Sequence, residues 1–487
     1  MTRNVGVVVT TSAIHSSVTP SVPGAGTAFF AGICERGPLN AAIQLDSPLD
    51  YDALCGGRTA TDTLYDAVRV FFREGGKRAY IARVAGTVPV KSTLSLKDGS
   101  AGAGLNTLRV DAANAGVWGN DLKVEVKVGT LANTFRLIIT YDGVVVADRT
   151  NLATPAAAAA AFATNRWVTV TDLVSVTASP TNNPRVLAAT ALASGDDDLD
   201  TVTTATPYIT ALTLFDEELG AGAVIIPGQD AADIASGVRT HCEAMNRIGL
   251  MSPPIATSYN DAIVAGAALL GVGGEWAGLF WPWVGYRDGT ITRWVDPAAF
   301  AAGCRARAHN DGAWQAAAAA AYGKATFVTE TEVRLTRANV NALAASGVNG
   351  IARRLSQVAL RAWYPQSEEN VDYPTLSVRD LLNVISVDLN KALDDDIAWR
   401  AVDGHGWVAT MAIGICAGYL EAIKAGNGLF ERYDGTKMVD PGYRVDRADT
   451  IESLEAGELR LRVSIRPAPH AALVSVDLVK VGVGSPL

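Results

Sequence analysis

The side chains that most often do chemistry are scattered along this chain of 487 residues. Its five histidines have no common spacing: His15, His241, His309, His405 and His470. The adjacent pair His241 and Cys242, and the step from Cys304 to His309, match neither finger-type nor catalytic zinc sites. We therefore expect no metal centre in this protein.

Neither of two glycine-rich segments matches a nucleotide-binding loop. Gly75-Gly76-Lys77 lacks the upstream glycine and the downstream Ser or Thr of a P-loop, and residues 24–26 precede a predicted strand instead of following one. The chain also lacks a Gly-x-Ser-x-Gly nucleophile turn. We expect no cofactor and no enzymatic activity. Because catalytic residues can come from distant positions, an α/β enzyme with a β-rich accessory domain stays open as an alternative.

Aspartates fill four of the five positions from 196 to 200: Asp196, Asp197, Asp198 and Asp200. Such a run could hold a hard cation weakly, yet the glycine and the closing glutamate of an EF-hand are missing. The sequence therefore favours a solvated loop at the boundary of a domain over a cation site.

The five cysteines contain no Cys-x-x-Cys pair: Cys34, Cys55, Cys242, Cys304 and Cys416. An odd, widely spaced set is typical of buried apolar cysteines and not of a disulfide framework or a zinc site. Cys55 lies beside the Gly56-Gly57 turn, so we expect it to be the most exposed of the five.

Composition excludes several classes of function. A formal charge of −9 and a sequence pI of about 5.2 argue against nucleic acid as a partner, because binding phosphates requires clustered Lys and Arg. The first residues do not form a signal peptide, and no uninterrupted apolar stretch approaches the roughly 20 residues of a membrane span. We expect synthesis in a cytoplasm and no stable membrane association.

Hydrophobic patterning places a strand–helix–strand unit near the start of the chain. Residues 28–34 are apolar and predict a buried strand, followed by a turn at 35–38. Residues 66–74 predict a half-buried helix that Gly75 and Gly76 end, and residues 79–84 predict a strand covered on both faces. This unit is typical of an α/β core.

The rest of the chain alternates between α/β and β-rich segments. Strands are predicted at 105–110, 122–128, 136–146, 223–227, 277–283 and 458–466, with a turn at Asp142-Gly143. Helices are predicted at 230–247, at 296–309, at 407–425 and in the alanine runs 156–161 and 316–321. Another helix begins near Ser377, which with Asp380 resembles a capping box.

Taken together, these elements predict a multidomain α/β and α+β protein. Its mixed α/β core is built from N-terminal and C-terminal segments, with an inserted β-rich domain and extended terminal β-arms. The expected divisions are an N-terminal arm (1–22), an N-terminal α/β segment of the core (23–90), the inserted outer domain (91–204), an α/β domain (205–350), the C-terminal core (351–466) and a C-terminal arm strand (467–487).

Several motifs, in their order along the chain, resemble contractile tail sheath proteins. The strongest segment, 28–84, combines a Glu-Arg-Gly-Pro turn with a Gly-Gly-basic turn and a strand of the form Ala-Tyr-x-x-Arg-Val. Weaker matches occur at 116–124, at 281–284 with 287–289, and at 347–353. The resemblance implies a structural subunit that polymerises helically around an inner tail tube and contracts to drive the tube through a bacterial envelope.

The resemblance also implies partners and contact residues. The partners are further copies of the chain, the inner tube protein, and baseplate and tail terminator or neck proteins, in a virion tail assembled in the bacterial cytoplasm for genome delivery. The arms are expected to exchange strands between subunits, although pairing within one subunit stays possible; their candidate residues are Val5, Val7, Val9, Val474, Val476 and Leu478.

Two further sets of contacts come from the same resemblance. Cys55 is a candidate for an inter-subunit disulfide, because a released particle meets oxidising conditions. Lys424, Arg432 and Lys437 are candidates for contacting an acidic tube, with ordinary solvated charges as the alternative. The sequence does not distinguish a phage tail from a phage-derived contractile injection system or an R-type bacteriocin.

Overall fold

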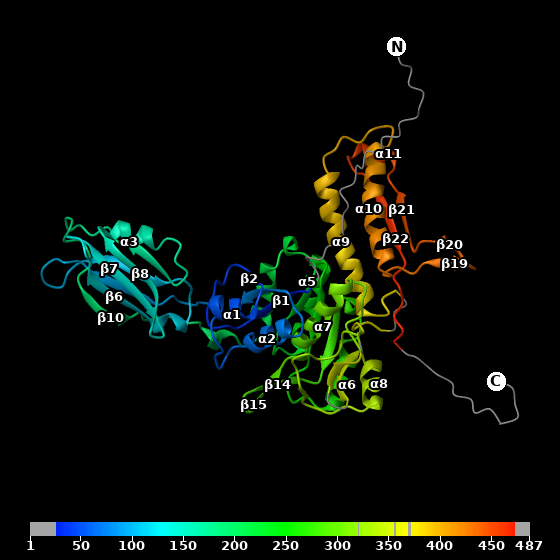
Figure 1. Cartoon of the computed structure of the whole chain (residues 1–487), viewed down its shortest axis with the longest axis horizontal. Helices are drawn as coiled ribbons and strands as arrows, with labels where there is room; N and C mark the ends of the chain where they lie inside the picture. Colours follow the sequence, from blue (N-terminus) through cyan, green and yellow to red (C-terminus); the bar gives the residue numbers. More distant parts are fainter. Residues whose placement is uncertain (1–25, 320, 355–356, 369–371, 473–487) are drawn as a thin grey trace, which may run out of the picture.

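The protein is divided into three regions along its length. The computed structural model describes residues 26–319, 321–354, 357–368 and 372–472. An α/β core lies between a β-rich insert and a C-terminal lobe built on two long helices (Figure 1). The predicted N-terminal arm and the predicted strand of the C-terminal arm lie outside the described residues.

An eight-stranded sheet organises the core and draws on two distant regions of the chain. Its central strands are parallel, whereas β2 and β18 pair antiparallel at the two edges. In spatial order the strands are β18 (Gln357–Leu360), β17 (Val348–Arg354), β13 (Ala277–Trp281), β12 (Ile248–Met251), β11 (Ala223–Ile225), β1 (Thr27–Gly32), β3 (Arg78–Arg83) and β2 (Ile43–Leu45). The predicted strand 28–34 is thus confirmed as β1, paired to β3 on one side and to β11 on the other.

Helices cover both faces of this sheet. Along β1, Ala28 and Phe30 point to one apolar cluster and Phe29 and Ala31 to the other, as the two-residue period of a strand requires. The first face carries α1 (Pro48–Leu54), α2 (Tyr65–Arg73) and α7 (Pro297–Asp311). The second carries α4 (Thr206–Ala211), α5 (Ala231–Met245), α6 (Tyr259–Leu269) and α8 (Arg337–Ala345).

The glycine pair after α2 acts as the sequence predicts. Gly75 has φ +116°, a backbone conformation that other residues rarely adopt, and a Cβ on Gly76 would lie 2.3 Å from the Phe71 ring. The chain can therefore turn sharply from α2 into β3, and the predicted helix stop is confirmed.

The insert folds around a hydrophobic core of its own. One sheet has three strands, β4 (Thr93–Lys97), β5 (Asn106–Ala112) and β9 (Val168–Asp172). The other has four, β10 (Leu187–Ala191), β6 (Leu122–Val128), β7 (Phe135–Tyr141) and β8 (Val144–Leu152), and α3 (Pro155–Ala161) follows β8. The predicted turn at Asp142-Gly143 joins β7 to β8, with positive φ at both residues.

The C-terminal lobe begins with α9 (Leu376–Asp396) and α10 (Trp407–Ala425), which stand beside each other above the core (Figure 1). A hairpin of β19 (Arg432–Asp434) and β20 (Lys437–Asp440) projects from the lobe. The sheet of β21 (Tyr443–Arg447) and β22 (Leu461–Ile465) packs against α10, and α11 (Ile451–Glu455) connects its strands. A separate small sheet in the core contains β14 (Val284–Asp288), β15 (Ile291–Val295) and β16 (Glu330–Thr331).

By length and composition alone, α10 could cross a membrane. Its side chains Cys416, Tyr419 and Ile423 are buried against α9 and the β21–β22 sheet. The predicted helix 407–425 is confirmed to the residue.

Two of the predicted features of helices are wrong. The described alanines of the run 316–321 are irregular instead of helical, because Ala316, Ala317 and Ala318 all pack into the core cluster that contains Val358 and Leu360 of β18. Ser377 does not cap α9, whose N-cap is Thr375, and Asp380 is buried inside the helix. The expected boundary at residue 350 falls inside β17, because the core sheet continues to Leu360.

Candidate functional site

The residues expected to exchange strands cannot be placed, since Val5, Val7, Val9, Val474, Val476 and Leu478 lie outside the described residues of the chain. Their potential acceptor can be described. The β21–β22 sheet has only two strands among the described residues, so both outer strands present unpaired main-chain groups. Such an edge can accept a further strand.

An apolar groove lies beside β22. Its volume is about 480 Å³, and its walls come from α9, α10 and the β22 region, with no contribution from β21. Leu461 and Val463 of β22 and Leu393 and Val408 of the helices line it. Trp399 lines it too, although its side chain is fully exposed. The groove therefore offers apolar contacts to a chain that would pair with the free edge of β22.

The three candidate tube-contacting cations lie close to one another in the sequence but in different settings. Lys424 is mostly buried and forms an ion pair with Glu421 at the end of α10. Arg432 and Lys437 are exposed on the β19–β20 hairpin, where Lys437 lies opposite Asp434. The hairpin therefore offers Arg432 and Lys437 to a partner, whereas Lys424 is already paired.

The outer face of α10 carries small residues at four-residue steps, Thr410, Gly414, Gly418 and Ala422, all exposed. A Cβ on Gly414 or on Gly418 would meet no atom within 4 Å. Small side chains allow close approach of another backbone, so this face is smooth enough for a partner to pack tightly against the helix.

A buried charge cluster joins the lobe to the core. Asp380 of α9 accepts two hydrogen bonds from the Arg305 guanidinium of α7, at 2.6 and 2.7 Å, and one from Nε2 of His309 at 2.8 Å. Burial and the adjacent Arg305 charge lower the pKa of His309, so the ring is neutral at pH 7. Although burial raises the pKa of Asp380, the Arg305 charge and the hydrogen bonds from Arg305 and His309 hold it well below its usual value.

A second contact fixes the same end of α9. Asn383 donates its side-chain amide to the main-chain oxygen of Arg247, 3.0 Å away. The buried Arg247 guanidinium in turn stacks over the Phe29 ring of β1 and donates to the carbonyls of Phe215 and Gly220. The first turns of α9 are thus anchored in the core, and its later turns carry the lobe.

Glu74 organises another region of the core. Its fully buried carboxylate accepts main-chain hydrogen bonds from Thr326, Phe327 and Val328 at 2.8 to 2.9 Å. It also forms an ion pair with Arg307 at 2.6 Å. It thus ties the C-cap of α2 to the segment that follows α7. Sequence reasoning missed Glu74, Arg247 and Arg305, because their partners are distant along the chain.

The acidic run forms a partly exposed loop at the boundary of the insert, with Asp196 and Asp200 exposed, and two of its carboxylates make specific contacts. Asp197 pairs with the buried Arg83, and Asp198 accepts from the Val88 amide at 2.8 Å and from the Thr87 hydroxyl at 3.1 Å. Across the described residues, no group of His, Cys, Asp and Glu could hold a metal ion. The run therefore secures the chain where it returns from the insert to the core.

All five cysteines are buried and unpaired in the described structure. Cys55 is 0% exposed, so the expectation that it is the most accessible is wrong. It lies in a buried apolar cluster with Tyr51 and Cys34, and the pKa of Cys34 is raised by a hydrogen bond to Cys55 and by burial. A disulfide to another subunit would first require Cys55 to be uncovered.

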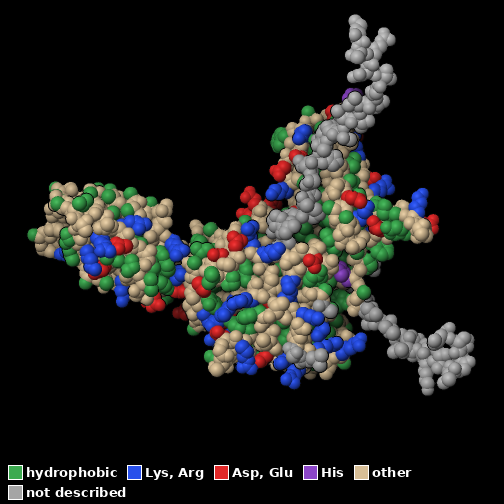
Figure 2. Space-filling model, viewed as in Figure 1, with side chains coloured by type: hydrophobic (Ala, Val, Ile, Leu, Met, Phe, Trp, Pro, Cys, Tyr) green, Lys and Arg blue, Asp and Glu red, His purple; other side chains and the backbone are tan. Residues whose placement is uncertain are grey.

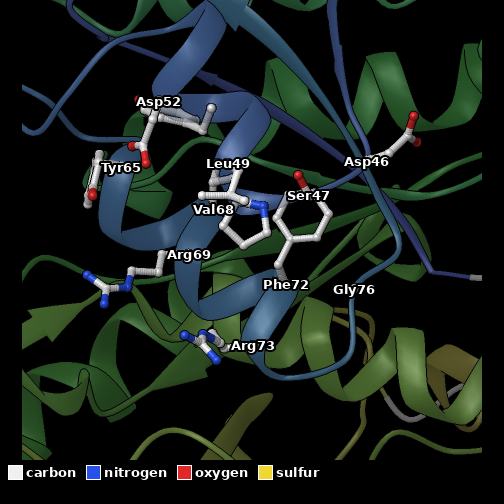
Figure 3. A pocket seen from close by; sticks show the side chains of 12 residues that line it. Asp46, Ser47, Leu49, Asp52, Tyr65, Val68, Arg69, Phe72, Arg73 and Gly76 are labelled. Atoms are coloured by element: carbon white, nitrogen blue, oxygen red, sulfur yellow. The ribbon is translucent and has the colours of Figure 1, made fainter.

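One open groove lies between α1 and α2 (Figure 3). It has a volume of about 620 Å³; Val68 and Phe72 contribute apolar surface, and Arg69, Arg73 and Asp52 contribute charge. The two arginines stack over Tyr286 and Phe327, so they are engaged in cation–π contacts. None of the residues that the sequence singled out as contacts lines this groove.

The fold of the chain is similar to that of solved sheath proteins. The similarity is to solved structures, whereas no protein-family model and no curated protein matches the sequence. A sheath tail protein from Listeria innocua aligns with a TM-score of 0.62 and 16% identity, over 91% of this chain and 96% of the other.

Two further solved structures give the same result. The sheath tail protein from Desulfitobacterium hafniense aligns with a TM-score of 0.60 and 15% identity, over 91% and 93% of the two chains. The contracted sheath of the extracellular contractile injection system PVC aligns with a TM-score of 0.56 and 14% identity, over 99% and 98%. The predicted fold class, an α/β core of N-terminal and C-terminal segments with a β-rich insert, is confirmed.

Proposed function

We propose that this chain is the structural subunit of a helical contractile sheath that surrounds an inner tail tube. Contraction of the sheath would drive the tube through a bacterial envelope to deliver a genome. The observation that carries this proposal is the sheath fold, which extends over at least nine tenths of the chain in the aligned structures. Two packings of one sequence can differ enough in interface to release work, so the subunit itself needs no nucleotide.

Subunits would be connected by their terminal arms. An arm strand from a neighbouring copy would pair with a free edge of the β21–β22 sheet and place apolar side chains in the groove beside β22. Main-chain pairing of this kind survives large rotations of the subunits. A head-to-tail contact that does not close on itself builds a filament, which fits a tubular sheath.

The C-terminal lobe would face the tube. Its small-residue face on α10 permits close packing, and Arg432 and Lys437 on the hairpin would meet acidic groups of the tube. Baseplate and terminator or neck proteins would contact the ends of the sheath. The assembled subunit would then belong to a virion tail built in the bacterial cytoplasm.

Negative-stain microscopy of the purified full chain tests the proposal. Hollow tubules are expected, whereas discrete particles under every assembly condition would refute it and favour the α/β enzyme alternative. A variant lacking residues 1–20 should stay folded and lose tubules. A second variant, with Val5, Val7 and Val9 changed to Ser, keeps the length of the chain and should also lose tubules. Normal tubules from both variants would refute strand exchange through the N-terminal arm without refuting the sheath function.

A second candidate function is also that of a sheath subunit. The PVC structure is named as belonging to an extracellular contractile injection system, so the chain could serve a particle without a genome. Purifying the assembled particle and assaying it for nucleic acid decides between the two, because the sheath subunit would be the same in both.

A further inference from the structure

We propose that Arg83 and Asp197 form a joint that fixes the orientation of the insert relative to the core. The Arg83 side chain is 1% exposed and that of Asp197 17%, and their charged groups are 2.5 Å apart. This inference goes beyond the proposed function, because it concerns the single chain and holds whether or not the chain polymerises.

Arg83 connects every segment that meets at this place. It is the last residue of β3, and its guanidinium donates to the carbonyls of Glu35 and Gly37 in the core turn. It also donates to the carbonyl of Ala115 in the insert at 2.8 Å. The partner Asp197 lies on the returning connection and accepts from the Val117 amide at 3.0 Å. One guanidinium thus joins the core turn, the insert and the returning chain.

The main chain at Gly116 lies directly against the pair. Gly116 has φ +136°, and a Cβ there would lie 2.6 Å from Oδ1 of Asp197 and 2.7 Å from a guanidinium nitrogen of Arg83. A side chain at position 116 would therefore separate the pair. This is the physical reason for glycine at the start of the Gly-Val-Trp-Gly segment that the sequence singled out.

Two polar contacts flank the pair. Tyr141 of β7 donates its hydroxyl to the Glu35 carboxylate. The Arg36 guanidinium stacks over the Trp167 and Tyr141 rings, 4.6 and 5.2 Å from their centroids. Glu35 and Arg36 of the Glu-Arg-Gly-Pro turn therefore bind the aromatic side chains of the insert by a hydrogen bond and by cation–π contacts.

The insert and the core share little apolar packing among the described residues. The fully buried side chains of the insert form a cluster separate from the two core clusters, and of the insert only the partly buried Val202 packs against a core cluster. The insert joins the core across a narrow neck (Figures 1 and 2). Domains joined by a small interface move relative to each other by default, so the few polar contacts at the joint decide whether the insert is held.

Spin-label distance measurements test the joint. Labels on Ala156→Cys in α3 and Ser236→Cys in α5 report the distance between insert and core, and the five native cysteines are buried. The labelled full chain is diluted with unlabelled chain to suppress distances between subunits. In otherwise unchanged protein and in the control Asp200→Asn, we expect one narrow distribution, because Asp200 is exposed and its charge lies outside the joint.

Asp197→Asn should give a distribution about twofold broader, since inter-domain motion is expected once a small interface is weakened. An unchanged width in this variant, or a broad distribution in the unchanged protein, would overturn the proposal. Circular dichroism verifies folding. If Asp197→Asn does not fold, Tyr141→Phe decides, because it removes only the hydroxyl bond to Glu35: broadening supports the joint and an unchanged width overturns it. Tubule formation is scored in a separate experiment, so a failure of the sheath proposal can be distinguished from a failure of the joint proposal.

Discussion

The buried pair of Arg305 and Asp380 gives the sharpest test of how the lobe is attached to the core. Asp380→Asn removes the negative charge and leaves the Arg305 guanidinium buried with a neutral partner, where both side chains are 2% exposed or less. Breaking a buried ion pair by removing one partner typically costs about 3–5 kcal/mol. We expect a loss of this size, because Asp380 accepts three hydrogen bonds of 2.6 to 2.8 Å.

Native-state hydrogen exchange of the α9 and α7 amides measures this loss locally. Asp395→Asn on the same helix is the control, because Asp395 is exposed. In this variant the free energy of local opening of α9 should change by less than about 0.5 kcal/mol. The double variant Arg305→Met with Asp380→Leu leaves no lone charge and should lose less than the single variant. A loss below about 1 kcal/mol for Asp380→Asn would refute the reasoning.

The remaining predictions concern pH, glycine, Glu74 and the thiols. Because the folded state lowers the pKa of His309 from its usual 6.5, its contribution to stability is present above pH 6.5 and is lost as the pH falls below it. The unfolding free energy of His309→Gln should therefore fall less steeply with acid than that of the unchanged protein, and parallel curves would contradict this. Gly414→Ala should stabilise α10 by about 0.5–1 kcal/mol in thermal melts of the single chain, since a Cβ there meets no atom; a loss would show that α10 is packed on that face. Glu74→Gln should cost about 2 kcal/mol in urea unfolding, because a fully buried carboxylate loses charged hydrogen bonds, and an unchanged midpoint would contradict its role. A thiol reagent should modify the five cysteines only after unfolding, and rapid labelling of the native protein at Cys55 would contradict its burial.

Local patterns predicted the elements well where one rule dominates. The strand 28–34, the stop at Gly75 and the helix 407–425 follow from apolar runs, from glycine geometry and from a sustained helical period, and the structure confirms all three. Asp380 was misinterpreted as a capping residue because Ser377-x-x-Asp380 satisfies a local motif. Its actual partner, Arg305, lies 75 positions away.

The candidate contacts were only partly predictable. The sequence singled out the Glu-Arg-Gly-Pro turn, the segment 116–124 that begins with Gly-Val-Trp-Gly, and the aspartate run separately. Their meeting around Arg83 depends on a pairing over 114 positions, which no local pattern contains. The prediction that Cys55 is exposed failed for the same reason, since the apolar cluster that buries Cys55 includes residues from other segments of the chain.

The sequence by itself determined the order of strands and helices, the β-rich insert and the positions where glycine ends an element, because these depend on neighbours within a few turns. The tertiary structure alone decided which charges are buried together and which strands of the lobe keep a free edge. Both depend on contacts between distant segments: removing one member of a buried charged pair leaves the other charge uncompensated, and a strand edge stays free only where no other segment pairs with it. The joints at Arg83 and at Asp380, and the open β21–β22 sheet, are therefore properties of the fold and not of any single motif.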